Sequence, residues 1–391
     1  MGLPERAAFS SRQCCFPEPE RMGEIRVDRI EQINTYYTCK ETLERRMVMK
    51  GRKSGFRSET KEAYQEWRTG LKQTLSDLIG LQNMTPCPLR AETLEKVVIE
   101  DGITREKVII EVEEDVWMPV YILIPEKVNE VPIPCFMAAP GHLGAGKYSV
   151  AGRREIPAVR DAIERFHYDY GLQMAKLGYV TFCPDCRGFG ERREAALQQD
   201  TENAFLNSTC FHLAHMAEPL GQTVIGMCTW DLMRLIDYIQ ARGEWKCEKV
   251  GCLGFSGGGM QTLWAGAMDD RIGISIISGY MYGYRDSLLT LNGNCSCNYV
   301  PGLWMHADMG DIAALHAPAP MLIQSCREDD LAGHSGLQNV IEQLEIIRSA
   351  YRLQGLEDRI VHDVRPGGHC FHPECLAPFL AHAQKVYEGE L

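Results

Sequence analysis

The chain has no apolar stretch long enough to form a membrane-spanning helix. Its 391 residues include no run that approaches the ~18 consecutive apolar residues that such a helix requires. Residues 1–16 carry charges where a secretory signal has an apolar core, and Arg6 stands where a myristoylation signal has Ser or Thr. We therefore expect a cytoplasmic protein that has no membrane partner.

The chain also lacks a basic run, an internal repeat and a low-complexity segment. Its 41 Lys and Arg residues are outnumbered by 53 Asp and Glu residues, which gives a formal net charge of −12. Proteins that follow a nucleic-acid backbone concentrate positive charge, so we expect no nucleic-acid partner. The composition, with 45% apolar and 24% charged residues, is typical of a globular protein.

The 16 cysteines are expected to be reduced thiols, because a chain of this length without a signal peptide is not a disulfide-stabilised mini-protein. Cys183 and Cys186 form a C-x-x-C pair, but no second pair and no nearby pair of histidines completes a zinc site. We therefore expect no metal and no cofactor. The other candidate cluster, which we interpret as a structural loop, contains Cys295, Cys297, His306 and Asp308.

Residues 1–90 differ in pattern from the rest of the chain. Apolar side chains recur at helical spacing over residues 64–81, and Pro86 and Pro88 follow. This pattern predicts a helical N-terminal segment, joined by a linker to a catalytic domain over residues 91–391. Two roles stay open for the segment: it covers a pocket, or it forms the interface of a homo-oligomer.

Residues 91–391 alternate strand-like runs with helix-like runs. Three runs typical of antiparallel strands come first, over residues 96–100, 107–112 and 116–125. Six apolar runs then alternate with amphipathic stretches such as residues 230–242 and 337–353. This order predicts an α/β fold, a mostly parallel twisted sheet with helices on both faces. The six apolar runs cover residues 133–139, 179–183, 250–255, 272–278, 321–325 and 360–364.

The stretch PGHLGAGKYS, residues 140–149, has the outline of a phosphate-binding loop. Gly141 and Gly146 have the required separation and Lys147 follows them, but Tyr148 stands where such a loop has Ser or Thr to hold magnesium. Asp185, at the end of a strand, could imitate the acidic partner of such a loop, as could any Asp in that position. Nucleotide binding is therefore disfavoured.

The stretch GFSGG, residues 254–258, matches the G-x-S-x-G pattern of a nucleophile elbow. It follows an apolar strand and opens a helix-like run, which is the context that this motif requires. The sharp turn at Ser256 needs small residues on both sides, and Gly254 and Gly258 supply them. The helix N-terminus behind Ser256 offers free N–H groups. Ser256 is therefore the candidate nucleophile.

A nucleophilic Ser needs a base and an orienting acid, and candidates for both follow late strands in this chain. His369, which follows two glycines after the last strand, is the favoured base. Asp329, after the preceding strand, is the favoured acid. The chain order of Ser, acid and His is that of α/β-hydrolases. The alternatives are Asp330, Glu328 and Asp286 for the acid, and His372 for the base.

Acyl transfer also needs hydrogen-bond donors for the developing oxyanion. One expected donor is the backbone N–H of Gly257, directly after the nucleophile. The other is expected from the glycine-rich loop that follows residue 139, through the N–H of His142 or of Leu143. The sequence does not choose between these two residues.

Together these motifs resemble the α/β-hydrolase superfamily and, more narrowly, its dienelactone-hydrolase-like branch with acetyl-xylan-esterase-like members. The resemblance runs from about residue 96 to the C-terminus. It implies Ser256 as nucleophile, Asp329 as acid and His369 as base. The stretches that carry it are GYVTFCPDCRGFGERR (178–193), VGCLGFSGGG (250–259), CSCNYVPGL (295–303), APAPMLIQSCREDD (317–330) and GGHCFH (367–372).

The sequence thus predicts a serine carboxylic-ester hydrolase that works through an acyl-enzyme without a cofactor. The resemblance implies acetylated sugars or other small-molecule esters as substrates. One alternative is a lactone or carbon–carbon bond hydrolase that uses the same three residues. Another is a non-catalytic binding or scaffold protein with the same fold.

Overall fold

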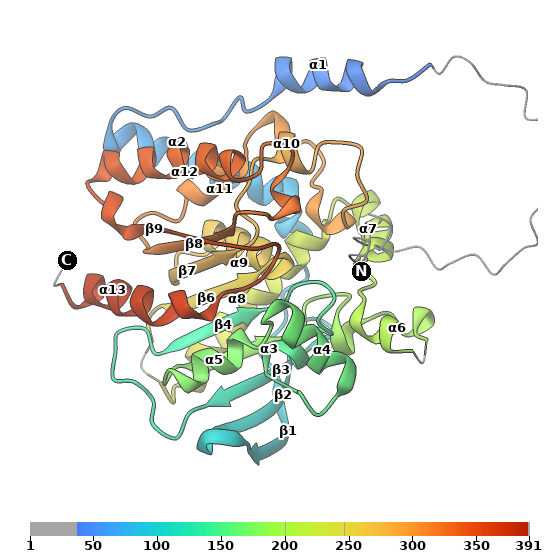
Figure 1. The fold of residues 1–391 in the computed structure, drawn as a ribbon, viewed down its shortest axis with the longest axis vertical. Coiled ribbons are helices and arrows are strands. Elements are labelled where there is room, and N and C mark those ends of the chain that lie inside the picture. Colours follow the sequence, from blue (N-terminus) through green and yellow to red (C-terminus); the bar gives the residue numbers. More distant parts are fainter. Residues whose placement is uncertain (1–36, 200, 246, 390–391) are drawn as a thin grey trace, which may run out of the picture.

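The computed structural model describes residues 37–199, 201–245 and 247–389. Their centre is one nine-stranded sheet with the order β1-β2-β3-β5-β4-β6-β7-β8-β9 (Figure 1). All nine strands lie where the sequence predicts strand-like runs, with ends that differ by a few residues. The strands are β1 (Ala91–Val98), β2 (Thr104–Glu113), β3 (Val116–Ile124), β4 (Cys135–Ala139), β5 (Val180–Pro184), β6 (Val250–Phe255), β7 (Ile272–Ser278), β8 (Met321–Cys326) and β9 (Ile360–Arg365).

The sheet is antiparallel at its first edge and parallel beyond it. β1, β2, β3 and β5 pair in antiparallel fashion, whereas β5, β4, β6, β7, β8 and β9 pair in parallel. The parallel strands therefore all end on the same side of the sheet, and open α/β sheets hold their sites at this carboxyl end. In particular, β4 pairs directly with β6, with Ala139 opposite Gly254.

Helices cover both faces of the sheet, which confirms the predicted fold class (Figure 1). One buried cluster packs α4, α5 and α13 on the sheet, and two others pack α2, α8, α9, α11 and α12. The helices are α1 (Lys40–Lys50), α2 (Lys61–Ile79), α3 (Lys147–Val150), α4 (Pro157–Phe166), α5 (Tyr170–Lys176), α6 (Glu202–Leu206), α7 (Cys210–Ala217), α8 (Val224–Arg242), α9 (Gly257–Met268), α10 (Tyr284–Ser287), α11 (Met309–Ala314), α12 (Leu337–Gln354) and α13 (Leu376–Glu388).

The helix α2 shares a core with the helices of the sheet. Its buried side chains are Tyr64, Leu71, Leu75 and Ile79, and they belong to the cluster that includes α9 and α12. The Tyr64 hydroxyl donates a hydrogen bond to the Ala314 carbonyl at 2.9 Å. Of the helical segment predicted over residues 1–90, residues 1–36 lie outside the described residues, and they include residues 1–16, where a signal peptide would lie.

None of the helices in the described ranges is both long and apolar enough to cross a membrane. The cytoplasmic location itself stays a prediction.

Candidate active site

Ser256 occupies a strained turn between β6 and α9. Its backbone has φ 57° and ψ −120°, a conformation that is costly for a residue with a side chain. The turn fits only because its neighbours have no Cβ. A Cβ on Gly254 would lie 2.2 Å from the carbonyl carbon of Gly258, and one on Gly258 would lie 2.1 Å from the Ala139 oxygen. The predicted elbow is thus present, with β4 pressed against it.

The loop after β4 lies beside this turn, because β4 and β6 are neighbours. The Gln261 amide on α9 donates to the Pro140 carbonyl at 2.8 Å and so joins the loop to the helix behind Ser256. A Cβ on Gly257 would lie 2.7 Å from Nδ1 of His142, so the imidazole packs directly on that glycine. The structure therefore brings together Gly257 and the His142–Leu143 segment, both predicted as oxyanion donors.

A buried tyrosine is hydrogen-bonded to the same loop. The Tyr168 hydroxyl donates to the backbone oxygen of His142. Burial raises the pKa of Tyr168 well above its usual value, so the hydroxyl stays protonated and able to donate. Leu143 follows with φ 62°, a left-handed conformation that turns the chain sharply after His142.

His369 and Asp329 form a hydrogen bond at the carboxyl edge of the sheet. Nδ1 of His369 lies 2.7 Å from Oδ2 of Asp329, whose other oxygen accepts the Leu331 N–H at 2.9 Å. The Asp329 side chain is 5% exposed. The His369 ring lies on Phe255, the residue before Ser256, with ring centroids 4.4 Å apart. Its Nε2 is buried and has no hydrogen-bond partner among the described residues.

The other candidate acids and the other candidate base make different contacts. Glu328 and Asp330 are exposed, and Glu328 accepts the N–H of Gly367. Asp286 accepts the N–H of Ser335 at 2.8 Å. His372 lies near His167, with ring centroids 6.1 Å apart, and burial lowers its pKa. The carboxylate that contacts His369 is that of Asp329.

The lysine of the phosphate-loop-like stretch is already paired. Nζ of Lys147 lies 2.6 Å from Oδ2 of Asp185, and both side chains are fully buried. The backbone N–H of Lys147 donates to Oδ1 of the same carboxylate at 2.7 Å. Asp185 therefore holds the loop in place through Lys147, and this lysine is not exposed to a phosphate.

Neither group of cysteines considered from the sequence forms a metal-binding cluster in the described part of the chain. Cys183 and Cys186 belong to different buried clusters. Asp308 caps α11, and Nδ1 of His306 lies 3.4 Å from the Ser54 hydroxyl, so neither residue completes a cluster with Cys295 and Cys297.

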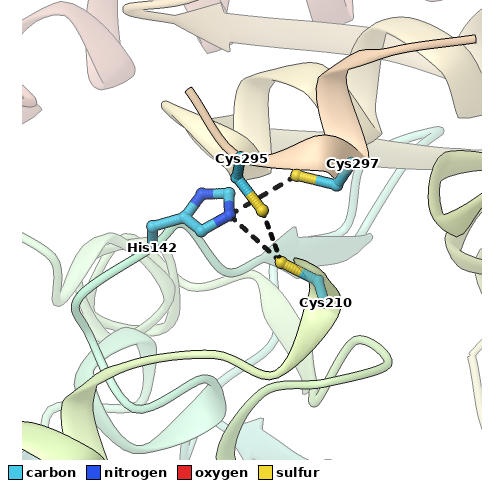
Figure 2. Close-up of side chains that lie close together, drawn as sticks. All are labelled: His142, Cys210, Cys295 and Cys297. Atoms are coloured by element: carbon cyan, nitrogen blue, oxygen red, sulfur yellow. Dashed lines mark hydrogen bonds between the residues drawn. The ribbon is translucent and has the colours of Figure 1, made fainter. Parts of the chain in front are cut away.

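Instead, the thiols of Cys295 and Cys297 lie close to the thiol of Cys210 and the imidazole of His142 (Figure 2). Sequence reasoning missed this group because 155 positions separate His142 from Cys297, so no local spacing signals it.

Comparisons with known proteins agree with this architecture. A model described as "Abhydrolase family" matches residues 25–365. The curated protein "Putative hydrolase YtaP" of Bacillus subtilis (strain 168) is 26% identical over 273 residues, which are 69% of this chain and 84% of that protein.

Two solved structures show the same fold. A "putative acetyl xylan esterase" from Bacteroides fragilis NCTC 9343 has a TM-score of 0.68 and 16% identity, covering 86% of this chain and 84% of its own. A "Glucuronoyl Esterase from Solibacter usitatus" has a TM-score of 0.60 and 17% identity, covering 86% of this chain and 96% of its own.

The family match confirms the predicted α/β-hydrolase fold and the expectation of an enzyme of the hydrolase class. The narrower dienelactone-hydrolase-like branch stays a prediction. Since the match extends from residue 25 to residue 365, the chain belongs to the Abhydrolase family.

Proposed function

We propose that the protein is a serine carboxylic-ester hydrolase in which Ser256 is the nucleophile, His369 the base and Asp329 the orienting acid. The observation that carries the proposal is the hydrogen bonding of the two ring nitrogens of His369. Its Nδ1 is held by a buried carboxylate at 2.7 Å, while its buried Nε2 has no hydrogen-bond partner among the described residues. A base held in this way keeps Nε2 ready to accept a proton.

Each step of the proposed reaction uses a group of this site. Oγ of Ser256 attacks the ester carbonyl carbon while Nε2 of His369 takes the hydroxyl proton. The carbonyl oxygen becomes an oxyanion, which accepts hydrogen bonds from the N–H of Gly257 and from the His142–Leu143 segment. When the tetrahedral intermediate collapses, the carbon–oxygen bond to the alcohol breaks and the alcohol leaves with the proton from His369.

Hydrolysis of the acyl-enzyme repeats these steps with water. His369 takes a proton from the water, whose oxygen adds to the acyl carbon, and collapse releases the carboxylic acid and returns the proton to Oγ of Ser256. Throughout, the Asp329 carboxylate stabilises the imidazolium and fixes the tautomer that presents Nε2 to the serine.

Small esters, in particular acetylated sugars, are the proposed substrates. The support is the names of structural neighbours, which include acetyl xylan and glucuronoyl esterases. At 16–17% identity they share the fold only, so the acyl and alcohol groups have to be found by assay. The proposed cytoplasmic location favours oligosaccharides and small molecules over polymers.

Labelling with a fluorophosphonate tests the proposal without knowledge of the substrate. We expect a single adduct on Ser256, located by peptide mapping, and no adduct on Ser256→Ala. Ser349→Ala is the control, since the Ser349 hydroxyl bonds only within α12, to the Glu345 carbonyl at 2.7 Å. A folded wild type that forms no adduct and hydrolyses neither 4-nitrophenyl acetate nor acetylated xylo-oligosaccharides would instead be a binding or scaffold protein.

A further inference from the structure

Four metal-binding side chains converge next to the nucleophile elbow (Figure 2). His142 comes from the loop after β4 and Cys210 begins α7, whereas Cys295 and Cys297 flank the start of a short 3-10 turn at Ser296–Asn298. The ligand atoms, one imidazole nitrogen and three sulfurs, all lie within 4.8 Å of one another. Three segments far apart in the chain therefore meet at these four side chains.

The chemistry of the cluster is that of a structural zinc site. Three cysteines and one histidine are a recurrent set of zinc ligands, and no carboxylate takes part. The three cysteines are 0%, 5% and 2% exposed, so the sulfurs are shielded from water. Soft thiolate donors select zinc over magnesium or calcium.

The distances from the His142 nitrogen to two of the sulfurs fit a metal ion at the centre of the cluster. Zinc bonds of about 2.3 Å to sulfur and about 2.0 Å to nitrogen, arranged as a tetrahedron, separate the nitrogen from each sulfur by about 3.6 Å. Nε2 of His142 lies 3.7 Å from Sγ of Cys210 and 3.5 Å from Sγ of Cys297.

Polar groups around the cluster are directed at the sulfurs. The Asn298 amide lies 3.8 Å from Sγ of Cys297 and also donates to the Cys295 carbonyl at 3.0 Å. The Ser208 hydroxyl lies 3.0 Å from Sγ of Cys210. Polar groups that contact the ligands in this way orient them and stabilise thiolates in metal sites.

We propose that His142, Cys210, Cys295 and Cys297 bind one Zn²⁺ ion. Four protein ligands complete a tetrahedron, so the ion has no open position for water or substrate. It acts as a structural clamp that joins the loop after β4 to α7 and to the 3-10 turn.

A disulfide between Cys210 and Cys295 is the main competing interpretation, because their sulfurs lie 2.7 Å apart. A disulfide would bring the two sulfurs about 0.7 Å closer, to about 2.05 Å, whereas a tetrahedral zinc ion would hold them about 1 Å further apart, at about 3.7 Å. A disulfide would also leave Cys297 and the His142 imidazole facing the pair without a function. Zinc gives all four side chains the same function.

The clamp has a consequence that rests on the proposed function. The His142 ring packs on Gly257, and its residue belongs to the segment expected to supply the second oxyanion donor. Zinc bound at Nε2 would fix this ring and the backbone around it. His142 is in this respect a positioning residue, and the metal reaches the chemistry only through the loop.

Metal analysis of the full-length protein tests the proposal directly. For wild type purified without chelators from zinc-supplemented cells, we expect inductively coupled plasma mass spectrometry to find about one zinc per chain. The double variant Cys295→Ala/Cys297→Ala should contain less than about one tenth of that amount. The control is Cys252→Ala, an equally buried thiol on β6 outside the cluster, which should keep its zinc.

Cobalt substitution of the wild type keeps the test decisive even if the double variant does not fold. Co²⁺ should give sulfur-to-metal charge-transfer bands in the near ultraviolet and the visible bands of a tetrahedral site. Reduced wild type that holds no zinc and takes up no cobalt would overturn the proposal. So would freshly purified protein whose intact mass is lower by two hydrogens until a reductant is added.

These measurements use no substrate, so they stand apart from the outcome of the esterase assays. If Ser256 labels as proposed, removal of zinc should slow its reaction with the fluorophosphonate by tenfold or more while far-UV circular dichroism stays unchanged. An unchanged labelling rate in zinc-free protein would refute the positioning role alone.

Discussion

Nδ1 of His369 lies 2.7 Å from Oδ2 of Asp329, and the neighbouring Asp330 is exposed to solvent. Two adjacent carboxylates therefore differ completely in their surroundings. The two residues should therefore respond differently to substitution. Asp329→Asn should lower kcat by ~10³–10⁴-fold with little change in KM, because an amide no longer selects the tautomer that leaves Nε2 unprotonated.

Asp330→Asn is the matched control and should keep kcat within about threefold, since an exposed carboxylate contributes little to a buried site. Steady-state kinetics on 4-nitrophenyl acetate measures both variants. A large loss in Asp330→Asn together with a small loss in Asp329→Asn would exchange the roles of the two residues.

The buried ion pair of Lys147 and Asp185 leads to a prediction about stability. Lys147→Met leaves the Asp185 carboxylate buried without its counter-charge, so the free energy of unfolding should fall by about 3–5 kcal/mol. Lys107→Met is the control: Lys107 pairs with Glu191 at 2.7 Å nearer the surface, and its loss should cost less than about 1 kcal/mol.

Urea denaturation of the three proteins measures this difference. The same melts in the presence of Mg–ATP check the phosphate-loop interpretation, because a lysine that is already paired offers no site and the midpoint should not move. Equal losses in the two lysine variants, or a midpoint raised by Mg–ATP, would contradict the structural role assigned to Lys147.

The helix α2 supplies a third prediction. Leu75 is fully buried in the core that α2 shares with α9 and α12, so Leu75→Ala should lower the free energy of unfolding by about 2–5 kcal/mol. Leu43→Ala on α1, where the side chain is 44% exposed, should change it by less than about 0.5 kcal/mol.

Deletion of residues 1–88 should accordingly abolish cooperative unfolding, because it removes Met84 and the four buried side chains of α2 from one core. A truncated protein that unfolds cooperatively with the wild-type midpoint would show that α2 is dispensable. The oligomeric state is therefore better tested on the full chain, by mass in solution, than on this deletion.

The strands and the elbow could be predicted from the sequence because their signals are local. Each strand is a short apolar run, and the turn at Ser256 needs glycines at fixed offsets, so a few adjacent residues carry the information. The neighbourhood of the elbow was predictable in part, since parallel strands bring their carboxyl ends to one edge of the sheet.

Features that depend on distant residues could not be predicted. The sequence favours Asp329 as the acid but leaves Asp330 open, and only packing decides that the first is buried and the second exposed. The sequence disfavours a phosphate loop at Lys147 because Tyr148 follows it, but it does not show that Lys147 pairs with Asp185, 38 positions away. The meeting of His142 with the cysteines depends on how three loops fold over the sheet, which no spacing along the chain reports.

The last prediction concerns His316, a buried histidine between α11 and β8. Its Nε2 lies 2.8 Å from the Leu263 carbonyl and its Nδ1 lies 3.1 Å from the Ser275 hydroxyl. Burial lowers its pKa to about 4, and the nearby charges of Arg68 and Lys72 act in the same direction. The hydrogen bond with the Leu263 carbonyl and the charge of Asp270 oppose this shift. The folded protein therefore keeps this ring neutral in mild acid.

In the unfolded chain the ring takes up a proton near its ordinary pKa of about 6.5, so between that pH and about pH 4 the unfolded state binds more protons. The stability contribution of His316 is thus present above about pH 6.5 and is lost as the pH falls toward 4. Between about pH 7 and about pH 4.5 the wild type should lose about 2 kcal/mol more than His316→Gln.

Urea melts at the two pH values measure this difference, and the comparison cancels the contribution of His362, whose pKa burial also lowers to about 4 in both proteins. The glutamine variant is expected to be less stable at neutral pH, because it replaces a well-packed ring, but its stability should depend less steeply on pH. Parallel pH profiles for the two proteins would mean that His316 takes up its proton at the same pH in the folded protein as in the unfolded chain, so that burial does not lower its pKa.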